Sequence, residues 1–313
     1  MKTIFFVNPK AGKGKLADRL EQEIPQAASR LKMDAAVYRT RSVGDAERRA
    51  RELCQAAGEE ELRLIACGGD GTLNEVLNGA ADCPNAAVGV MPIGTGNDFC
   101  RNFPEAGDFL SVEAQLLGRP IPCDAIRYSG LLDGREQTRY CANMFNIGFD
   151  CNVVDMAATL KKYPLIGGSL AYLLAVLVIL IKKKGADLTV ELDGETCQDG
   201  KLLLCALANG SFCGGGLKSA PTATVHDGVM DVNIVYNVSR LNFIHKFPHY
   251  ANGTIHQVRN IEKVLLSRQC RRVAVTPRNG TMRLCADGEI VNAGKITFEA
   301  VPNAFRFVIP SIP

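Results

Sequence analysis

The sequence predicts two domains, an N-terminal α/β domain built on a parallel sheet and a C-terminal, mostly antiparallel β domain. Up to about residue 121, short apolar runs alternate with longer stretches of helical periodicity, as in repeated strand–helix units. From residue 122 onward, strand-like runs separated by Gly, Asn and Asp turns dominate. One apolar helical stretch near 153–184 interrupts them. With 313 residues, the chain is long enough for both domains.

In the first domain, buried strands are expected where apolar residues run continuously, and helices where they recur every three or four positions. The expected strands are 2–7, 35–40, 62–67 and 86–92. The expected helices lie between the first strand and residue 31, at 44–57 and at 72–81. Because strands and helices alternate, the strands are expected to run parallel with helices covering the sheet.

In the second domain, the strand-like runs are short and closely spaced, which favours an antiparallel sheet or a β-sandwich. They are 121–128, 139–149, 188–194, 201–210, 230–237, 271–277, 282–289 and 295–301.

The interrupting stretch contains 18 uncharged residues, at 164–181, with lysines on both sides. This length is at the threshold for a membrane span. However, a single span would separate the glycine-rich loops from the acidic motif near residue 289 by a bilayer, and Pro164, Gly167 and Gly168 shorten the helix. A helical insertion that packs in the core and one that docks on a membrane both remain open.

Composition excludes some functions. The formal net charge of +3 and pI of about 8.2 are too mild for a protein whose main partner is nucleic acid. The 12 cysteines are spread along the chain without a C-x-x-C pair, so reduced thiols are expected. The 4 histidines form no zinc-binding pattern.

Three glycine-rich loops follow predicted strands of the first domain: NPKAGKGK (8–15), GGDGTLNE (68–75) and PIGTGNDF (92–99). The carboxyl ends of parallel strands share one edge of a sheet, which is where such sheets bind ligands. Glycines there let the backbone approach a phosphate, and helix N-termini offer free N–H groups. None of the loops is a Walker A motif or a dinucleotide fingerprint. Each loop alone could be an ordinary turn, but together they indicate a phosphate site.

The chain resembles bacterial lipid kinases of the diacylglycerol kinase catalytic-domain type. The resemblance rests on NPKAG (8–12), GGDGTLNE, GTGNDF (94–99), NGSFCGGG (209–216) and ADGE (286–289), with HDGVMDV (226–232) as a further match. GGDGT also occurs in NAD kinases and phosphofructokinases, whereas the later motifs are typical of the lipid kinases.

This resemblance covers nearly the whole chain and implies its domain plan. An ATP-binding domain would comprise 1–121 together with a returning C-terminal tail, 302–313, that includes FRFVIP (305–310). A β-sandwich lipid-substrate domain would comprise 122–301, with the active site in the cleft between the two.

The resemblance also implies which residues bind ATP. They are Asn8, Pro9, Lys10, Ala11, Gly12, Thr40, Gly69, Asp70, Gly71, Thr72, Leu73, Asn74, Glu75 and Thr95. Thr40 has the weakest support, because its surroundings match only loosely.

Glu289 resembles the catalytic base of this family, which would accept the proton of the lipid hydroxyl. Asp287 of the same motif and Asp70 are assigned with it to the catalytic centre. Asp287-Gly288 is also a typical hairpin turn, and that interpretation remains open.

Magnesium is the expected metal, because the phosphates of ATP need charge compensation. By resemblance, Asp70, Asp98 and Asp124 lie near it. A second, structural Mg²⁺ would use Asp227 with main-chain oxygens of Thr224 and Val229, although Asp227-Gly228 could equally be a turn.

The expected function is therefore ATP-dependent phosphorylation of a lipid hydroxyl, in the first place diacylglycerol giving phosphatidic acid. Another glycerolipid, a sphingoid base and a polyprenol are further acceptors to consider. The alternatives are a kinase of a soluble acceptor, as in NAD kinases, and a non-catalytic nucleotide or lipid sensor. We expect a cytoplasmic protein, peripherally associated with the inner face of the plasma membrane, that does not bind nucleic acid and could form a homodimer.

Overall fold

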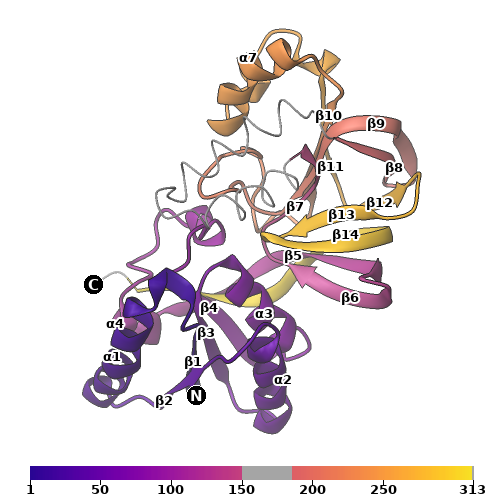
Figure 1. Cartoon of the computed structure of the whole chain (residues 1–313). Coiled ribbons are helices and arrows are strands. Elements are labelled where there is room, and N and C mark those ends of the chain that lie inside the picture. The colour runs from indigo at the N-terminus through magenta and orange to yellow at the C-terminus, as the bar shows by residue number, and fades with distance from the viewer. Residues whose placement is uncertain (150–184, 312–313) are drawn as a thin grey trace. The chain divides into compact units, whose positions relative to one another are not determined.

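The computed structural model describes residues 1–149 and 185–311 (Figure 1). Contacts between Cα atoms divide the chain into two compact units. Unit 1 comprises Met1–Ala125 and Pro302–Pro313, and unit 2 comprises Ile126–Val301. The expected helical insertion at 153–184 lies outside the described residues.

Unit 1 is built on parallel strands made of continuous apolar runs. The strands are β1 (Lys2–Val7), β2 (Ala35–Arg39), β3 (Leu62–Gly68) and β4 (Ala86–Pro92). β1 lies between β2 and β3, and β4 pairs with the other side of β3, all in parallel. All seven residues of β3 are buried, as expected for a strand covered on both faces.

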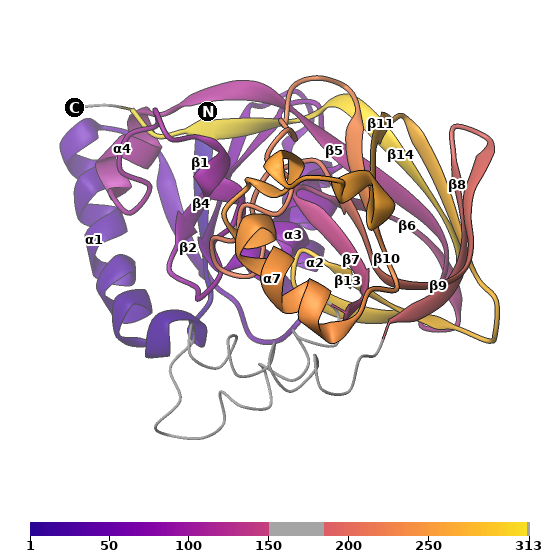
Figure 2. The ribbon, with the colours of Figure 1, turned by 90° about the horizontal axis from the view of Figure 1, so that it is seen from above.

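Helices cover both faces of this sheet (Figures 1 and 2). On one side lie α1 (Lys15–Leu31) and α4 (Val112–Leu117), and on the other lie α2 (Asp45–Ala57) and α3 (Asp70–Ala80). The helix after GGDG begins at Asp70, two residues earlier than the sequence predicts, so Asp70 belongs to the first helical turn rather than to a loop. The short α4 was not predicted.

The end of the chain contributes one more strand to unit 1. The last part of β14 (Glu289–Ile309) pairs in parallel with β4, Arg306 with Ala87 and Phe307 with Val88. Phe307 is fully buried, and its ring centroid lies 4.9 Å from that of Phe99 and 5.0 Å from that of Phe103. Phe99 closes the third glycine-rich loop, so the tail packs against the segment that supports this loop.

Replacing Phe307 by Ala should destabilise unit 1 by about 3–5 kcal/mol, because it empties a fully buried aromatic site. Urea denaturation followed by circular dichroism measures this loss. Leu117→Ala is the control, because Leu117 is 55% exposed and its truncation should change stability little. Equal stabilities of the two variants would show that the tail does not stabilise unit 1.

Unit 2 consists mainly of antiparallel strands. Its described strands are the later part of β5 (Arg119–Leu132), β6 (Arg135–Cys141), β7 (Met144–Gly148), β8 (Ala186–Leu192), β9 (Glu195–Ala208), β10 (Met230–Tyr236), β11 (Leu265–Cys270), β12 (Arg272–Pro277), β13 (Met282–Ala286) and the first part of β14.

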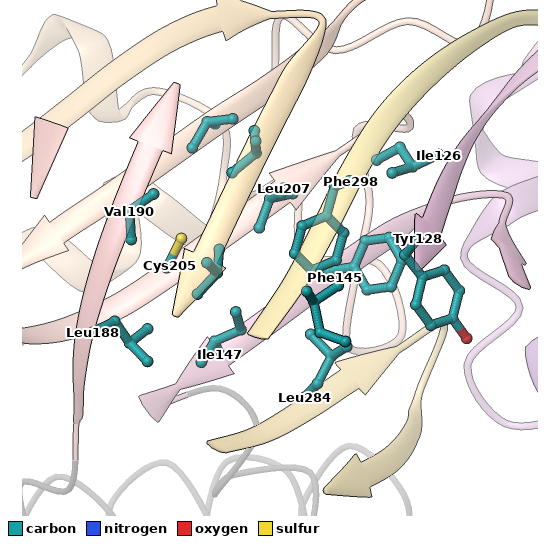
Figure 3. Packing of buried hydrophobic residues seen from close by; sticks show 14 of the residues in the cluster. Ile126, Tyr128, Phe145, Ile147, Leu188, Val190, Cys205, Leu207, Leu284 and Phe298 are labelled. Atoms are coloured by element: carbon teal, nitrogen blue, oxygen red, sulfur yellow. The ribbon is translucent and has the colours of Figure 1, made fainter. Parts of the chain in front are cut away.

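Six of these strands pair in a closed ring. From β7 the pairing passes to β9, β8, β12, β14 and β13, and then returns to β7. The ring encloses a core that includes Phe145, Leu207, Leu284 and Phe298 (Figure 3). The antiparallel sheet was expected, but strand pairing here joins what a sandwich would keep as two separate sheets.

Unit 2 differs from the sequence prediction in three places. The run 139–149, expected as one strand, is divided between β6 and β7, and the backbone N–H groups of Ala142 and Asn143 between them bind a carboxylate of another segment. The helix α7 (Arg240–Ala251) was not predicted, because Pro248 lies inside it. The strand β11, which has three exposed polar residues, was also missed.

The cysteines are reduced in the described part of the chain, where eleven are free thiols. Several are buried like small apolar residues, and burial raises the pKa of Cys205 to about 12. Among the helices that the structure describes, none is long and apolar enough to span a membrane.

Candidate active site

The second and third glycine-rich loops of unit 1 are pressed against each other. A Cβ atom built on Gly94 would lie 2.3 Å from Gly69 Cα, and Gly94 N–H donates to the carbonyl of Gly68 (3.1 Å). Real Cβ atoms do not tolerate such a distance, so a residue without a side chain is required at position 94. The two loops therefore form one rigid unit at the carboxyl edge of β3 and β4.

The first loop reaches the same place. Gly12 has a positive φ of 57°, and a Cβ on it would lie 2.9 Å from the carbonyl oxygen of Ile93. Asn8 Nδ2 donates to Thr72 Oγ1 (3.1 Å), and Asn8 Oδ1 accepts from Lys10 N–H (3.0 Å). All three loops are thus brought together by direct contacts within unit 1.

A polar pocket of about 360 Å³ opens between the first loop, the loop after β2 and the start of α3. Its lining consists of Asn8, Pro9, Lys10, Thr40, Arg41, Ser42, Val43, Ala46, Thr72 and Glu75. Six of these were assigned to ATP from the sequence, including Thr40, which had the weakest support.

Glu75 shapes this pocket by fixing the start of α2. Its Oε1 accepts from Gly44 N–H (2.9 Å) and its Oε2 from Ala46 N–H (3.1 Å). These are donors that a helix start leaves without intrahelical partners. The carboxylate thus joins α3 to the loop after β2, which carries Arg41 and Ser42.

Asp70 holds the third loop in place. Its Oδ2 accepts from Asn97 N–H (2.7 Å) and its Oδ1 from Asp98 N–H (2.9 Å). A Cβ at Gly96 would lie 2.6 Å from Asp70 Oδ2, so glycine is needed for this approach. Asp70 therefore acts on the backbone of GTGND, a role that the sequence did not predict.

Some of the residues assigned to ATP do not line the pocket. Leu73 and Asn74 are buried, and the Asn74 side chain accepts from Asn78 Nδ2 (3.2 Å). Their side chains pack inside unit 1, and their assignment to the ATP site remains a prediction. The others outside the lining are Ala11, Gly12, Gly69, Asp70, Gly71 and Thr95.

In unit 2, Asp287 and Gly288 form the tip of a two-residue hairpin between β13 and β14. Both have positive φ, 47° and 89°, as a type I′ turn requires, and Ala286 pairs with Glu289. The turn interpretation of ADGE is therefore correct as far as its backbone is concerned. The hairpin leaves Glu289 exposed at the first position of β14.

The carboxylate of Asp287 is engaged by the segment between β6 and β7. It accepts from the backbone N–H groups of Ala142 (3.0 Å), Asn143 (3.0 Å) and Met144 (3.1 Å). Asn143 Nδ2 in turn donates to the carbonyl of Phe212 (2.7 Å), within the NGSFCGGG motif. Asp287 thus fixes the hairpin that carries Glu289 and links the two late motifs.

Known proteins match along almost the whole chain. The family model for the diacylglycerol kinase catalytic domain matches residues 2–128, and that for the YegS C-terminal NAD kinase beta sandwich-like domain matches 143–309. A diacylglycerol kinase of Staphylococcus aureus is 32% identical over 256 residues, which are 80% of this chain and 76% of that protein. The chain belongs to the diacylglycerol kinase catalytic-domain family.

Solved structures extend the likeness to the fold. A diacylglycerol kinase from Bacillus anthracis superposes with a TM-score of 0.69 at 20% identity, over 98% of this chain and 96% of that one. A yeast NADH kinase complexed with NADH gives a TM-score of 0.50 at 11% identity, over 99% of this chain and 84% of that one. The kinase therefore has a two-domain, NAD kinase-like fold.

Two of the acidic side chains assigned to magnesium lie close enough together in unit 1 to suit a Mg²⁺ ion. Asp70 and Asp98 both border Gly96, since a Cβ there would lie 2.6 Å and 3.5 Å from their Oδ2 atoms. Mg²⁺ commonly binds one or two carboxylates and completes its shell with water and phosphate oxygens, so this pair suits it. In the described residues, however, no three His, Cys, Asp or Glu side chains cluster as a metal site.

The other acids assigned to magnesium have structural contacts. Asp124 is buried, and its Oδ1 accepts from Asn303 N–H (2.8 Å), which fixes the returning tail. Asp227 Oδ1 accepts from Val229 N–H (3.2 Å) across Gly228, whose φ is 72°. This is the turn that the sequence left as an alternative for Asp227, and Thr224 is exposed nearby in the chain.

Apart from Thr40, sequence reasoning missed the loop after β2 and the start of α2. Arg41, Ser42, Val43 and Ala46 line the polar pocket, and Arg41 is the one arginine of that lining. The signal available was position, because this loop also follows a parallel strand at its carboxyl end. It has no glycine-rich motif of the kind that identified the other three loops.

Replacing Gly94 by Ala should weaken ATP binding at least about tenfold, because the new methyl group forces the second and third loops apart. Glu59→Ala is the control, because Glu59 is an exposed residue of the same unit that lies outside the polar pocket and the three loops. Isothermal titration with ATP measures both affinities, and equal values would contradict the packing argument.

Proposed function

We propose that this kinase transfers the γ-phosphate of ATP to the hydroxyl group of a membrane lipid, with diacylglycerol as the first candidate acceptor and phosphatidic acid as the product. Membership of the family supports phosphoryl transfer from a nucleotide. The acceptor class rests on one further observation, an apolar pocket in unit 2.

This pocket has a volume of about 550 Å³ and lies between α7 and strands β9, β10 and β11. Its lining is Phe149, Leu203, Leu204, Val235, Val238, Asn242, Phe243, Lys246, Phe247, Tyr250, Ile255, Ile261, Val264 and Leu265. Lys246 is the one charged side chain of this lining. Such a surface suits an acyl chain, whose burial is favourable in proportion to its apolar area.

A soluble acceptor such as NAD fits the same pocket poorly. Its ribose, phosphate and amide groups would lose hydrogen bonds to water, and the apolar lining could not replace them. This argument favours a lipid acceptor over the NAD kinase alternative.

The nucleotide is proposed to bind at the polar pocket and the three loops of unit 1. Lys10 and Arg41 would offset phosphate charge there, and the backbone of the packed glycine loops would approach the phosphates closely. Magnesium, when bound near Asp70 and Asp98, would neutralise charge on the phosphates.

The chemical step needs a base on the acceptor side. The lipid hydroxyl oxygen forms a bond to the γ-phosphorus, the bond from this phosphorus to the β–γ bridging oxygen breaks, and the hydroxyl proton passes to the Glu289 carboxylate. Asp287 is proposed to position Glu289 through the hairpin and to take no part in proton transfer. Its carboxylate is already engaged by backbone donors.

The apolar pocket can be tested with Val235→Phe, which adds bulk to its lining. KM for a long-chain diacylglycerol in mixed micelles should rise about tenfold or more, because a tightly packed site tolerates added volume poorly. KM for a short-chain, water-soluble diacylglycerol and the affinity for ATP should change little. An equal effect on both acceptors would show that the pocket does not receive the acyl chain.

A further inference from the structure

The helix α7 is apolar on two faces. On its inner side, Phe243, Phe247 and Tyr250 pack against the sheet of unit 2 through a cluster that includes Leu204 and Leu265. On its outer side, Leu241 is 81% exposed and Ile244 is 54% exposed. A surface helix normally presents polar residues on the face opposite its core contacts.

The outer apolar residues form a stripe. Leu241, Ile244 and Pro248 are all exposed, and they are spaced as one face of a helix. No other pair of large, exposed apolar side chains in the described residues lies one helical turn apart on the same helix. We call Leu241, Ile244 and Pro248 the α7 stripe.

The helix α7 contains two cationic side chains, Arg240 and Lys246, and no Asp or Glu. Arg240 is exposed at the start of the helix. An exposed apolar stripe with Arg240 beside it, on a helix without acidic side chains, is complementary to a bilayer surface with anionic headgroups. A protein partner would need its own acidic rim, whereas an anionic membrane supplies charge and apolar depth together.

We propose that the α7 stripe docks this kinase on an anionic phospholipid bilayer, with Leu241 and Ile244 entering the headgroup region. Membrane docking itself does not depend on the proposed function. Only its purpose rests on that function, because docking would let the kinase reach an acceptor that resides in the bilayer. The apolar pocket is lined by the inner face of the same helix, so docking would bring the pocket to its lipid.

The test is binding to vesicles, measured by co-sedimentation without ATP. The full-length protein should bind mixed phosphatidylcholine–phosphatidylglycerol vesicles and bind pure phosphatidylcholine vesicles much less. The double variant Leu241→Ser/Ile244→Ser should bind the anionic vesicles about tenfold or more weakly, because it removes the apolar surface that enters the bilayer. Arg240→Gln should weaken binding to anionic vesicles only.

The matched control is Leu110→Ser/Leu117→Ser, which removes two apolar side chains of unit 1 that are 47% and 55% exposed. It should bind like the parent protein. Equal binding of both double variants, or no vesicle binding by the parent, would overturn the proposal. So would a change of oligomeric state in the α7 double variant, measured by light scattering without vesicles, because the stripe would then contact a second copy.

Kinase assays separate this inference from the proposed function. With a short-chain diacylglycerol in solution, the α7 double variant should turn over like the parent protein, since no membrane is involved. If vesicle binding depends on the α7 stripe but no lipid is phosphorylated, the docking proposal stands and the proposed lipid kinase function is wrong.

Discussion

Glu289→Gln should lower kcat for phosphoryl transfer by about 10²–10⁴-fold, the range that a general base contributes. Glutamine keeps the size of the side chain but cannot accept the hydroxyl proton. Glu289 lies at the exposed start of β14 in unit 2, whereas the polar pocket is built entirely from unit 1. The dissociation constant for ATP should therefore stay within about twofold of the parent value.

Steady-state kinetics and ATP titration on the same preparation separate these two effects. Glu136→Gln is the control, because Glu136 is an exposed acid of the same unit, on β6, and should leave kcat unchanged. If Glu289→Gln retains the parent kcat, Glu289 is not the base. A loss of folding in Glu289→Gln, seen by circular dichroism, would assign it a structural role.

Asp70→Asn should reduce kcat/KM for ATP on the order of 100-fold and destabilise unit 1 by roughly 2–4 kcal/mol. The carboxylate accepts from the N–H groups of Asn97 and Asp98, and an amide has only one acceptor oxygen. Its NH₂ group would face one of these donors, so the third loop would lose the position on which the site depends.

Stability and ATP affinity should decline together in this variant, in contrast to Glu289→Gln. Thermal denaturation and ATP titration measure the two losses, and Asp82→Asn, at an exposed acid of the same unit, is the control. Full stability with normal ATP binding and lost turnover would instead indicate that Asp70 takes part in the chemical step itself.

The sequence predicted the fold best where burial makes the pattern simple. The runs at 62–67 and 86–92 are continuously apolar, and β3 and β4 are buried almost throughout. Residues 139–149 look like one strand because apolar and aromatic residues recur throughout the run. The break into β6 and β7 depends on Asp287, more than 140 positions away, whose carboxylate takes N–H groups that a longer strand would have used.

The parts of the site that depend on a local glycine requirement could be predicted, and those that depend on long-range contacts could not. The glycine loops were identified because close backbone approach requires glycine wherever it occurs, as Gly94 and Gly12 show. The lining by Arg41 and Ser42 depends on how Glu75 binds the start of α2, which no local pattern reveals. The roles of Asp70 and Asp287 as backbone acceptors likewise became clear only from three-dimensional contacts.

The most direct measurement of the central claim is phosphate transfer from γ-labelled ATP, with magnesium, to a panel of acceptors. The panel comprises diacylglycerol, phosphatidylglycerol, sphingosine and undecaprenol in mixed micelles, with NAD in solution as the soluble acceptor. We expect label in a lipid product, with diacylglycerol the best acceptor, and none in NADP. Label in NADP with unlabelled lipids would contradict the account, and no transfer to any acceptor would point to a nucleotide- or lipid-binding sensor.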